Sequence, residues 1–316
     1  MLGVKISHCD DFISLYQQHF IESLLRLYSM DKCKPVGTPL PHQAHMGPAS
    51  EDELEKLKAL KVSYWSAIGR INYLRTVTRP DLLHTVSSLS QFLENPGMKH
   101  WHNFLHVLKY LRGTENMGLV YSLNSEEGIR AYSDTDWRNC QETHRSVTGF
   151  LVTFKGNLAI WNTRKQPTVS LSTTAAEYKA LCDLTSEIVW FWHWCQECSL
   201  FETTRPIPVH EDNQSCISTV EGKSNLNQKR MKHIKIQFHF IKEVVKNSTI
   251  PLIYTPTNLM LVDFLTNSMN CLSLSHSLDS LGILHLSVKG GVENNDQDQP
   301  DLQPATPKTP TATPPQ

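Results

Sequence analysis

Residues 129–137 read Ile129-Arg130-Ala131-Tyr132-Ser133-Asp134-Thr135-Asp136-Trp137, a β-like run that ends in two acidic residues flanked by aromatic ones. Strands prefer β-branched and aromatic residues and are depleted in Asp, so Asp134 needs a reason to stand where a strand should continue. A bound cation is one such reason. Asp136 points to the same face of an ideal strand, and the pattern leaves open whether it supports the same site or is a solvent group at the strand end.

Three further carboxylates follow on different predicted elements: Glu177, Asp212 and Asp263. Any one of the four acids taken alone would more often be a solvated surface charge than a ligand. Four acids on four elements can nevertheless converge on one site, and oxygen ligands suit Mg²⁺ and Mn²⁺. The sequence therefore predicts a hard-metal site built around Asp134.

Composition sets few limits on the class of protein. The chain has 316 residues, enough for one large domain or two of ordinary size with real cores. Its 30 Lys and Arg residues against 31 Asp and Glu residues predict no polyanion partner from net charge, although an acidic tail can mask a basic face in such a sum.

The cysteines and the apolar runs indicate a soluble protein of a reduced compartment. Eight cysteines at irregular positions and the lack of an apolar leader predict an intracellular location, cytoplasmic or nuclear. Cys195 and Cys198 have the spacing of half a zinc site, but no second pair completes it, so we expect two thiols on a helix. No apolar run approaches the roughly 20 residues of a membrane span, and we expect no membrane partner.

From about residue 128 the hydrophobic period predicts alternating strands and helices. A mixed sheet of five strands with helices on both faces follows, which makes the fold class α/β. The predicted strands cover residues 129–134, 147–154, 158–161, 207–210 and 250–254, the predicted helices cover 173–198, 213–220 and 229–245, and a last helix holds Asp263.

The segments before and after this sheet differ from it. A hairpin of strands at 2–6 and 12–15 and a helix near 20–28 lead into a Pro-rich linker, and residues 51–121 have a helical pattern throughout. Asp81 follows Pro80 as expected for an acid in the first turn of a helix. Apolar density falls after about residue 270, and from Gly290 the chain is rich in Asn, Asp, Gln, Pro and Thr, which predicts disorder.

Several motifs of the chain resemble one known family. The motifs at and after the opening stretch are Tyr132-Ser133-Asp134-Thr135-Asp136-Trp137, Arg145-Ser146-Val147-Thr148-Gly149-Phe150, Trp161-Asn162-Thr163-Arg164-Lys165-Gln166, Ala176-Glu177-Tyr178, Glu211-Asp212-Asn213-Gln214-Ser215, Lys232-His233-Ile234 and His239-Phe240-Ile241. They closely resemble the ribonuclease H region of copia-type LTR retrotransposon Pol polyproteins. Upstream, Tyr64-Trp65-Ser66-Ala67-Ile68-Gly69, Thr78-Arg79-Pro80-Asp81 and Tyr110-Leu111-Arg112-Gly113-Thr114 look like the segment that joins the polymerase to that nuclease, and Leu2-Gly3-Val4-Lys5-Ile6 looks like the segment after the polymerase's acidic motif.

The resemblance covers the chain up to about Leu286 and implies its organisation. It implies a remnant of the reverse transcriptase palm and thumb at 1–47, a mainly helical thumb and connection segment at 48–124, a ribonuclease H-like domain at 128–270 and a disordered Pro/Thr-rich tail at 271–316. No Tyr-x-Asp-Asp motif is present. We therefore expect no polymerase active site in this chain.

The resemblance also implies a metal-dependent endoribonuclease that hydrolyses the RNA strand of RNA/DNA hybrids and supports reverse transcription and transposition. It implies that Asp134, Glu177, Asp212 and Asp263 are the catalytic carboxylates and hold two Mg²⁺ or Mn²⁺ ions. Asp134 would bridge the ions, Asp263 would lie on the nucleophile side, and the other two acids on the leaving-group side. The implied partners are the hybrid and the upstream reverse transcriptase region of the polyprotein, in a virus-like particle if the element is active.

Substrate contacts are expected from loops near the acids, with 2′-hydroxyl and phosphate groups as their targets. Each candidate has an alternative role on a hairpin or helix surface, and His233 could either assist proton transfer or pack on its helix. The candidates are Arg145, Ser146, Arg164, Lys165, Asn213, Gln214, Arg230, Lys232 and His233.

Departures from the family pattern keep a second function open. None of these departures removes one of the four carboxylates. The residues that differ are Arg138-Asn139, Ala175, Gln228, Met260, Val262 and Asn267. The alternative to the nuclease is a catalytically silent, degenerate or host-adopted remnant that binds nucleic acid. A retroviral-type integrase is disfavoured, because its Asp, Asp, Glu spacing and its zinc-binding domain are not apparent.

Overall fold

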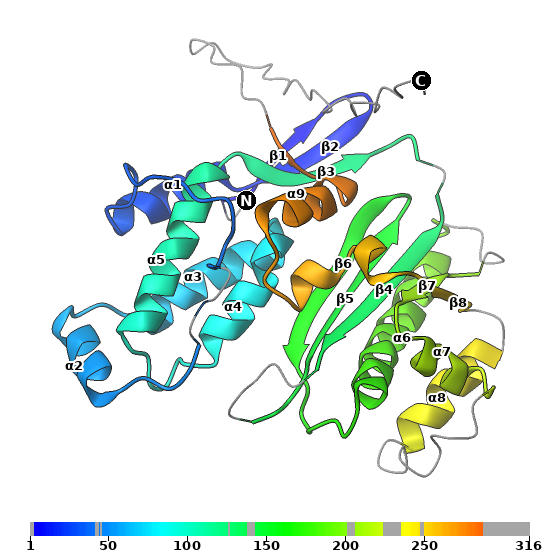
Figure 1. The fold of residues 1–316 in the computed structure, drawn as a ribbon. Helices are drawn as coiled ribbons and strands as arrows, with labels where there is room; N and C mark the ends of the chain where they lie inside the picture. Colours follow the sequence, from blue (N-terminus) through cyan, green and yellow to red (C-terminus); the bar gives the residue numbers. More distant parts are fainter. Residues whose placement is uncertain are drawn as a thin grey trace, which may run out of the picture.

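The computed structural model describes residues 3–41, 44, 46–125, 127–137, 143–200, 206–223, 235–246 and 250–286. Within them the strands form a four-stranded sheet in the order β1-β2-β3-β9 and a five-stranded sheet in the order β6-β5-β4-β7-β8 (Figure 1). The strands of the first sheet are antiparallel. They are β1 (Lys5–His8), β2 (Phe12–Tyr16), β3 (Met117–Ser122) and β9 (Ile283–His285).

The five-stranded sheet confirms the predicted mixed α/β fold. Its antiparallel meander consists of β4 (Ile129–Asp136), β5 (Val147–Phe154) and β6 (Asn157–Lys165). Two short strands, β7 (Val209–Glu211) and β8 (Leu252–Tyr254), continue the sheet parallel to β4. The central strand β4 therefore has an antiparallel neighbour on one side and a parallel neighbour on the other.

One face of this sheet is covered by α6 (Thr173–Glu197), together with α7 (Gln214–Val220) and α8 (Lys235–Lys246) (Figure 1). Ser172 begins α6, because its hydroxyl accepts a hydrogen bond from the backbone N–H of Ala175. Leu181, Leu184 and Ile188 recur at helical spacing and are buried against the sheet. The long helix is thus fixed at its start and along one stripe.

The other face is covered by segments from both ends of the described chain. Its apolar core contains Leu83 of α4 (Leu83–Ser90) and Leu119 of β3, and also Leu274 of α9 (Cys271–Ser280) and Ile283 of β9. These residues pack with Tyr132 of β4. A single core therefore crosses the boundaries that the sequence predicted at about 124 and 270.

Two predictions are wrong in this region. Residues 117–121 were expected to be helical but lie in β3, because pairing with both β2 and β9 satisfies their backbone in the sheet. Residues 271–285 were expected in a disordered tail but form α9 and β9. Asn270 caps α9 by accepting a hydrogen bond from the backbone N–H of Ser273, and buried apolar residues hold the helix. The rest of the predicted tail, beyond 286, lies outside the described residues.

The predicted helical segment is otherwise confirmed. Its helices and the preceding helix α1 (Gln18–Leu27) surround a core that includes Ile21, Ile71, Phe104 and Leu111. No helix in the described part of the chain is both long and apolar enough to cross a bilayer. The helices are α1, α2 (Glu51–Ala59), α3 (Tyr64–Val77), α4 and α5 (Met98–Gly113), with a 3₁₀ turn at Pro80–Leu82.

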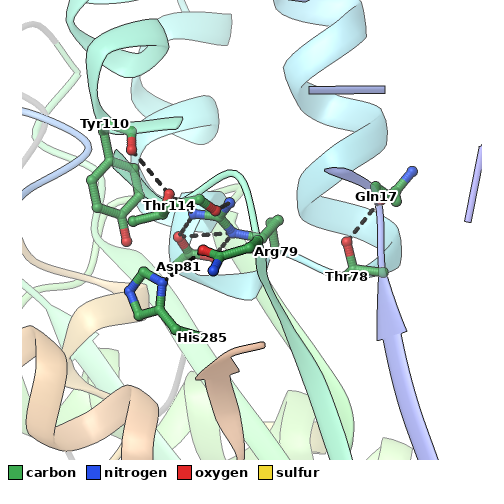
Figure 2. A network of polar contacts seen from close by, with 8 residues as sticks. Gln17, Thr78, Arg79, Asp81, Tyr110, Thr114 and His285 are labelled. Atoms are coloured by element: carbon green, nitrogen blue, oxygen red, sulfur yellow. Dashed lines mark hydrogen bonds and ion pairs between the residues drawn. The ribbon is translucent and has the colours of Figure 1, made fainter. Parts of the chain in front are cut away.

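A buried network around an Arg79–Asp81 ion pair joins the motif at 78–81 to the motif at 110–114 (Figure 2). Arg79 and Asp81 have fully buried side chains and are 2.7 Å apart between Nη2 and Oδ2. Arg79 also donates to the backbone carbonyl and the hydroxyl of Thr114, and that hydroxyl donates to the carbonyl of Tyr110. Asp81 is therefore the partner of a buried guanidinium, which the first-turn interpretation had missed.

We expect Asp81→Asn to destabilise the chain by roughly 3–5 kcal/mol, because it leaves the guanidinium of Arg79 buried without a counter-charge. Urea unfolding followed by circular dichroism measures the change. Asp52→Asn is the matched control, since Asp52 pairs with Lys56 on the surface and both side chains are mostly exposed. Equal unfolding midpoints for the two variants would contradict the role assigned to the buried pair.

Candidate metal centre

The structure brings three of the four predicted carboxylates together. One side-chain oxygen from each of Asp134, Glu177 and Asp212 lies within 4.8 Å of the others. They come from β4, from α6 and from the residue after β7. Because β4 pairs with β7 and packs against α6, residues far apart in sequence meet at one end of the sheet.

Asp134 lies on the face of β4 that carries Tyr132, because side chains alternate along a strand. It pairs in register with Gly149 of β5. Its Oδ2 accepts a hydrogen bond from the hydroxyl of Thr266. The Asp134 carboxyl is buried, and burial raises its pKa to about 6, with the charge of Asp212 adding to the increase and the Thr266 bond opposing it.

Glu177 faces the sheet from the second turn of α6, on the stripe that continues through Leu181 and Leu184. Burial raises the pKa of Glu177 well above its usual value, and the charges of Glu211, Asp134 and Asp212 raise it further. Its Oε2 is buried and has no hydrogen-bond partner among the described residues. A buried acceptor without a donor is costly, so this oxygen fits a ligand atom of a cation.

Asp212 and Asp263 lie at the edges of the cluster. Asp212 is half-buried, and its Oδ2 accepts a hydrogen bond of 2.6 Å from the hydroxyl of Thr257. Asp263 begins a 3₁₀ turn (Asp263–Leu265) and not the predicted helix, and its Oδ1 is buried without a partner among the described residues. Burial, followed by the charges of Asp134 and Asp212, raises the pKa of Asp263 to about 7. Asp263 therefore interacts electrostatically with the clustered acids but is not one of the three acids within 4.8 Å of one another.

Glu211 is a fifth acid that the sequence analysis did not assign. It is fully buried, and its carboxyl accepts hydrogen bonds from the hydroxyl of Ser133 at 2.8 Å and from the backbone N–H of Asn213 at 3.2 Å. Burial raises the pKa of Glu211 above its usual value. Its place as the last residue of a strand, next to Asp212, is the sequence signal that could have found it.

Asp136, whose role the sequence left open, is not one of the three clustered acids. Burial raises the pKa of Asp136 to about 6, and the charge of Asp134 adds to this effect. Asp136 is therefore an electrostatic neighbour of the cluster rather than a solvent group at the strand end.

The candidate substrate-binding residues differ in exposure and in hydrogen bonding. Arg145 and Gln214 are exposed. Ser146, the residue before β5, is fully buried, and its contact with substrate stays a prediction. The side chain of Asn213 caps α7 by accepting from the backbone N–H of Cys216.

The two cations of β6 already bind protein groups. Arg164 donates to Asp183 Oδ2 at 3.0 Å, and Lys165 donates to Gln91 Oε1 at 3.0 Å. Three other candidates lie outside the described residues: Arg230, Lys232 and His233.

The cluster predicts that metal-free protein loses stability as pH rises. A carboxyl with a raised pKa in the folded state favours the protonated form, so its contribution is fully present below pH 4 and is lost through the folded pKa. For Asp134, the increase from 3.8 to about 6 corresponds to about 3 kcal/mol. We expect the free energy of unfolding, measured with urea in EDTA, to fall between pH 4 and pH 8. A free energy of unfolding that does not change with pH would contradict the crowding of these charges.

Removing one charge is expected to stabilise the metal-free protein and to weaken its response to metal. At pH 8 in EDTA, Asp134→Asn is expected to melt at a higher temperature than the wild type, because it relieves burial and repulsion of a carboxylate. Mg²⁺ is expected to raise the melting temperature of the wild type and not of this variant. Asp136→Asn serves as the matched control on the same strand and is expected to keep the Mg²⁺ response. Loss of the response in the control alone would place the metal elsewhere.

The sequence of the whole chain has clear relatives, although no protein-family model matches it. It is 35% identical over 272 residues to the retrovirus-related Pol polyprotein from transposon TNT 1-94 of Nicotiana tabacum, covering 84% of this chain and 20% of that protein. It is 43% identical over 129 residues to the secreted RxLR effector protein 161 of Plasmopara viticola, covering 41% of this chain and 91% of that protein. Among solved structures, LC11-RNase H1 in complex with an RNA/DNA hybrid is 17% identical, with a TM-score of 0.32, and the match covers 41% of this chain and 86% of that one.

The Pol relatives match most of this chain, at identities of 28% to 35%. The chain spans about a fifth of the length of these polyproteins. Over most of its length, this chain is a relative of the copia-type retrovirus-related Pol polyproteins of plant transposons.

Proposed function

We propose that this chain is the ribonuclease H part of a copia-type retrotransposon Pol polyprotein and hydrolyses the RNA strand of RNA/DNA hybrids. The convergence of Asp134, Glu177 and Asp212 carries the proposal, because oxygen-rich clusters of this kind are suited to Mg²⁺ or Mn²⁺. Asp263 is the fourth proposed ligand. Asp263 Oδ1 and Glu177 Oε2 have no hydrogen-bond partner among the described residues, and a bound cation would satisfy both oxygens.

The residues present fit a pair of divalent cations. When bound, two such cations supply Lewis-acid chemistry that activates water and stabilises the leaving oxygen in an in-line displacement at phosphorus. The protein's own part is to hold the carboxylates close together in spite of their repulsion. Ser133 and the N–H of Asn213 hold Glu211 behind the cluster, and Thr257 holds Asp212 at its edge.

Recognition of the hybrid is assigned to exposed groups near the cluster. Arg145 precedes β5 and Gln214 begins α7, and both are exposed. We assign Arg145 to a phosphate and Gln214 to a 2′-hydroxyl, which is the group that distinguishes RNA from DNA. Arg164 and Lys165 would first have to leave Asp183 and Gln91.

The remaining segments are assigned by their resemblance to the Pol relatives. Residues 1–47 and 48–124 are proposed as the end of the polymerase and the connection, without a polymerase active site. The upstream reverse transcriptase region of the polyprotein is the proposed protein partner. The family departures Met260 and Val262 are buried in the apolar core, so they change packing and remove no ligand of the proposed centre.

A cleavage assay tests the proposed function. Purified chain with Mg²⁺ or Mn²⁺ is expected to cut only the RNA strand of a labelled RNA/DNA hybrid and to leave duplex DNA intact. Asp134→Asn is expected to lower the rate at least about 100-fold, because it removes a central ligand. Asp52→Asn is the surface control and is expected to cut like the wild type.

The alternative function makes a different forecast in the same assay. A catalytically silent remnant would bind the hybrid, remain folded and produce no metal-dependent cleavage at any concentration of Mg²⁺ or Mn²⁺. That result would overturn the nuclease.

A further inference from the structure

Thr266 lies beside the central carboxylate and has no role in the proposed ligand set. It is fully buried, and its hydroxyl contacts Asp134 Oδ2. The side-chain amide of Asn267 donates to the same hydroxyl oxygen at 3.1 Å. The Thr266 oxygen is therefore an acceptor for Asn267, and its single proton is available for a different acceptor.

Two acceptors compete for that proton. One is the carbonyl of Asp263, 3.1 Å from Thr266 Oγ1, and the other is Asp134 Oδ2. A hydrogen bond to a carboxylate is stronger than one to a neutral carbonyl, so the proton belongs to Asp134. Thr266 thus fixes one oxygen of the acid that lies at the centre of the cluster.

Gly149 on β5 leaves room for the side chain of Thr266. Gly149 is the register partner of Asp134, so a side chain there would stand next to the carboxylate. A Cβ at Gly149 would lie 2.6 Å from Thr266 Cγ2 and 3.0 Å from Leu265 Cβ. The absence of a side chain at 149 therefore allows the 3₁₀ turn to reach Asp134.

Groups on two further elements hold the turn in place. The hydroxyl of Thr163 on β6 donates to the carbonyl of Leu265 at 2.8 Å. His84 on α4 is buried and hydrogen-bonds the backbone of Thr266, and its Nε2 lies 3.4 Å from the hydroxyl of Ser268. The helix α4 belongs to the upstream segment, so a residue outside the sheet reaches the turn that holds Asp134.

We propose that Thr266 is a positioning residue for Asp134 and that His84 positions Thr266, which makes the upstream helix α4 part of the metal centre. The inference rests on the proposed function and deepens it. Without the hydroxyl, the Asp134 carboxylate is free to rotate away from the neighbouring negative charges. The cations then lose a ligand that is held in place before they bind.

The first test compares Thr266→Val, which keeps the shape, with Thr266→Ser, which keeps the hydroxyl. Mn²⁺ affinity is measured by isothermal titration calorimetry without nucleic acid. Loss of a partner of a ligand typically costs 10–100-fold in metal affinity, so we expect Thr266→Val to bind at least about 10-fold more weakly and Thr266→Ser to bind like the wild type. Equal affinity of Thr266→Val and the wild type would overturn the proposal.

A double-mutant cycle tests whether His84 acts through Thr266. His84→Phe is expected to weaken Mn²⁺ binding in the wild type and to have no further effect in Thr266→Val, because the two residues form one chain of contacts. His106→Phe is the control, since His106 also bonds a backbone carbonyl, that of Thr38, and makes no hydrogen bond to the turn within the described part of the chain. Additive losses, or no loss in His84→Phe, would overturn the role of α4.

Folding and function are separated by two further readouts. Circular dichroism in EDTA checks that each variant is folded, and Gly149→Ala supplies an independent displacement of Thr266 that is expected to lower Mn²⁺ affinity as Thr266→Val does. If the wild type binds Mn²⁺ but does not cut the hybrid, the nuclease fails while the titrations still decide the positioning role. If the wild type binds no Mn²⁺, both are overturned.

Discussion

Repulsion between buried carboxylates is the constraint on which the site depends. Asp134, Glu177 and Asp212 meet within 4.8 Å, and Glu211 and Asp263 carry further acidic groups around them. Burial and mutual charge raise the pKa of Asp134, Glu177 and Asp263. Such an arrangement opposes folding at neutral pH, so the rest of the structure has to hold it together.

The two apolar cores of the sheet hold the acidic residues in place. The core between β4, β5 and α6 fixes Glu177, and the core on the other face fixes the turn with Asp263. The second core includes Leu83 from the upstream segment, where the buried Arg79, paired with Asp81, is hydrogen-bonded to Thr114 at the end of α5. Stability gained far from the acids therefore offsets the cost of bringing the acids together.

The sequence predicted those features that depend on local pattern. The period of two and the turn residues predicted β4, β5 and β6, and the 3.6-residue stripe predicted α6. It failed where tertiary contacts decide: β3 needs partners at both edges, and α9 needs a core built from distant residues. Thr266 was missed although it stands three residues after Asp263, one helical turn away, because a hydroxyl in an apolar run has no signal of its own.

A crystal structure of the chain soaked with Mn²⁺, with the ions located by anomalous scattering, tests the proposed metal centre. We expect two Mn²⁺ peaks among these carboxylates, roughly 4 Å apart, which is the spacing of two-metal nuclease centres. Peaks at any other place, or no peak among these carboxylates at a Mn²⁺ concentration that supports cleavage, would contradict it.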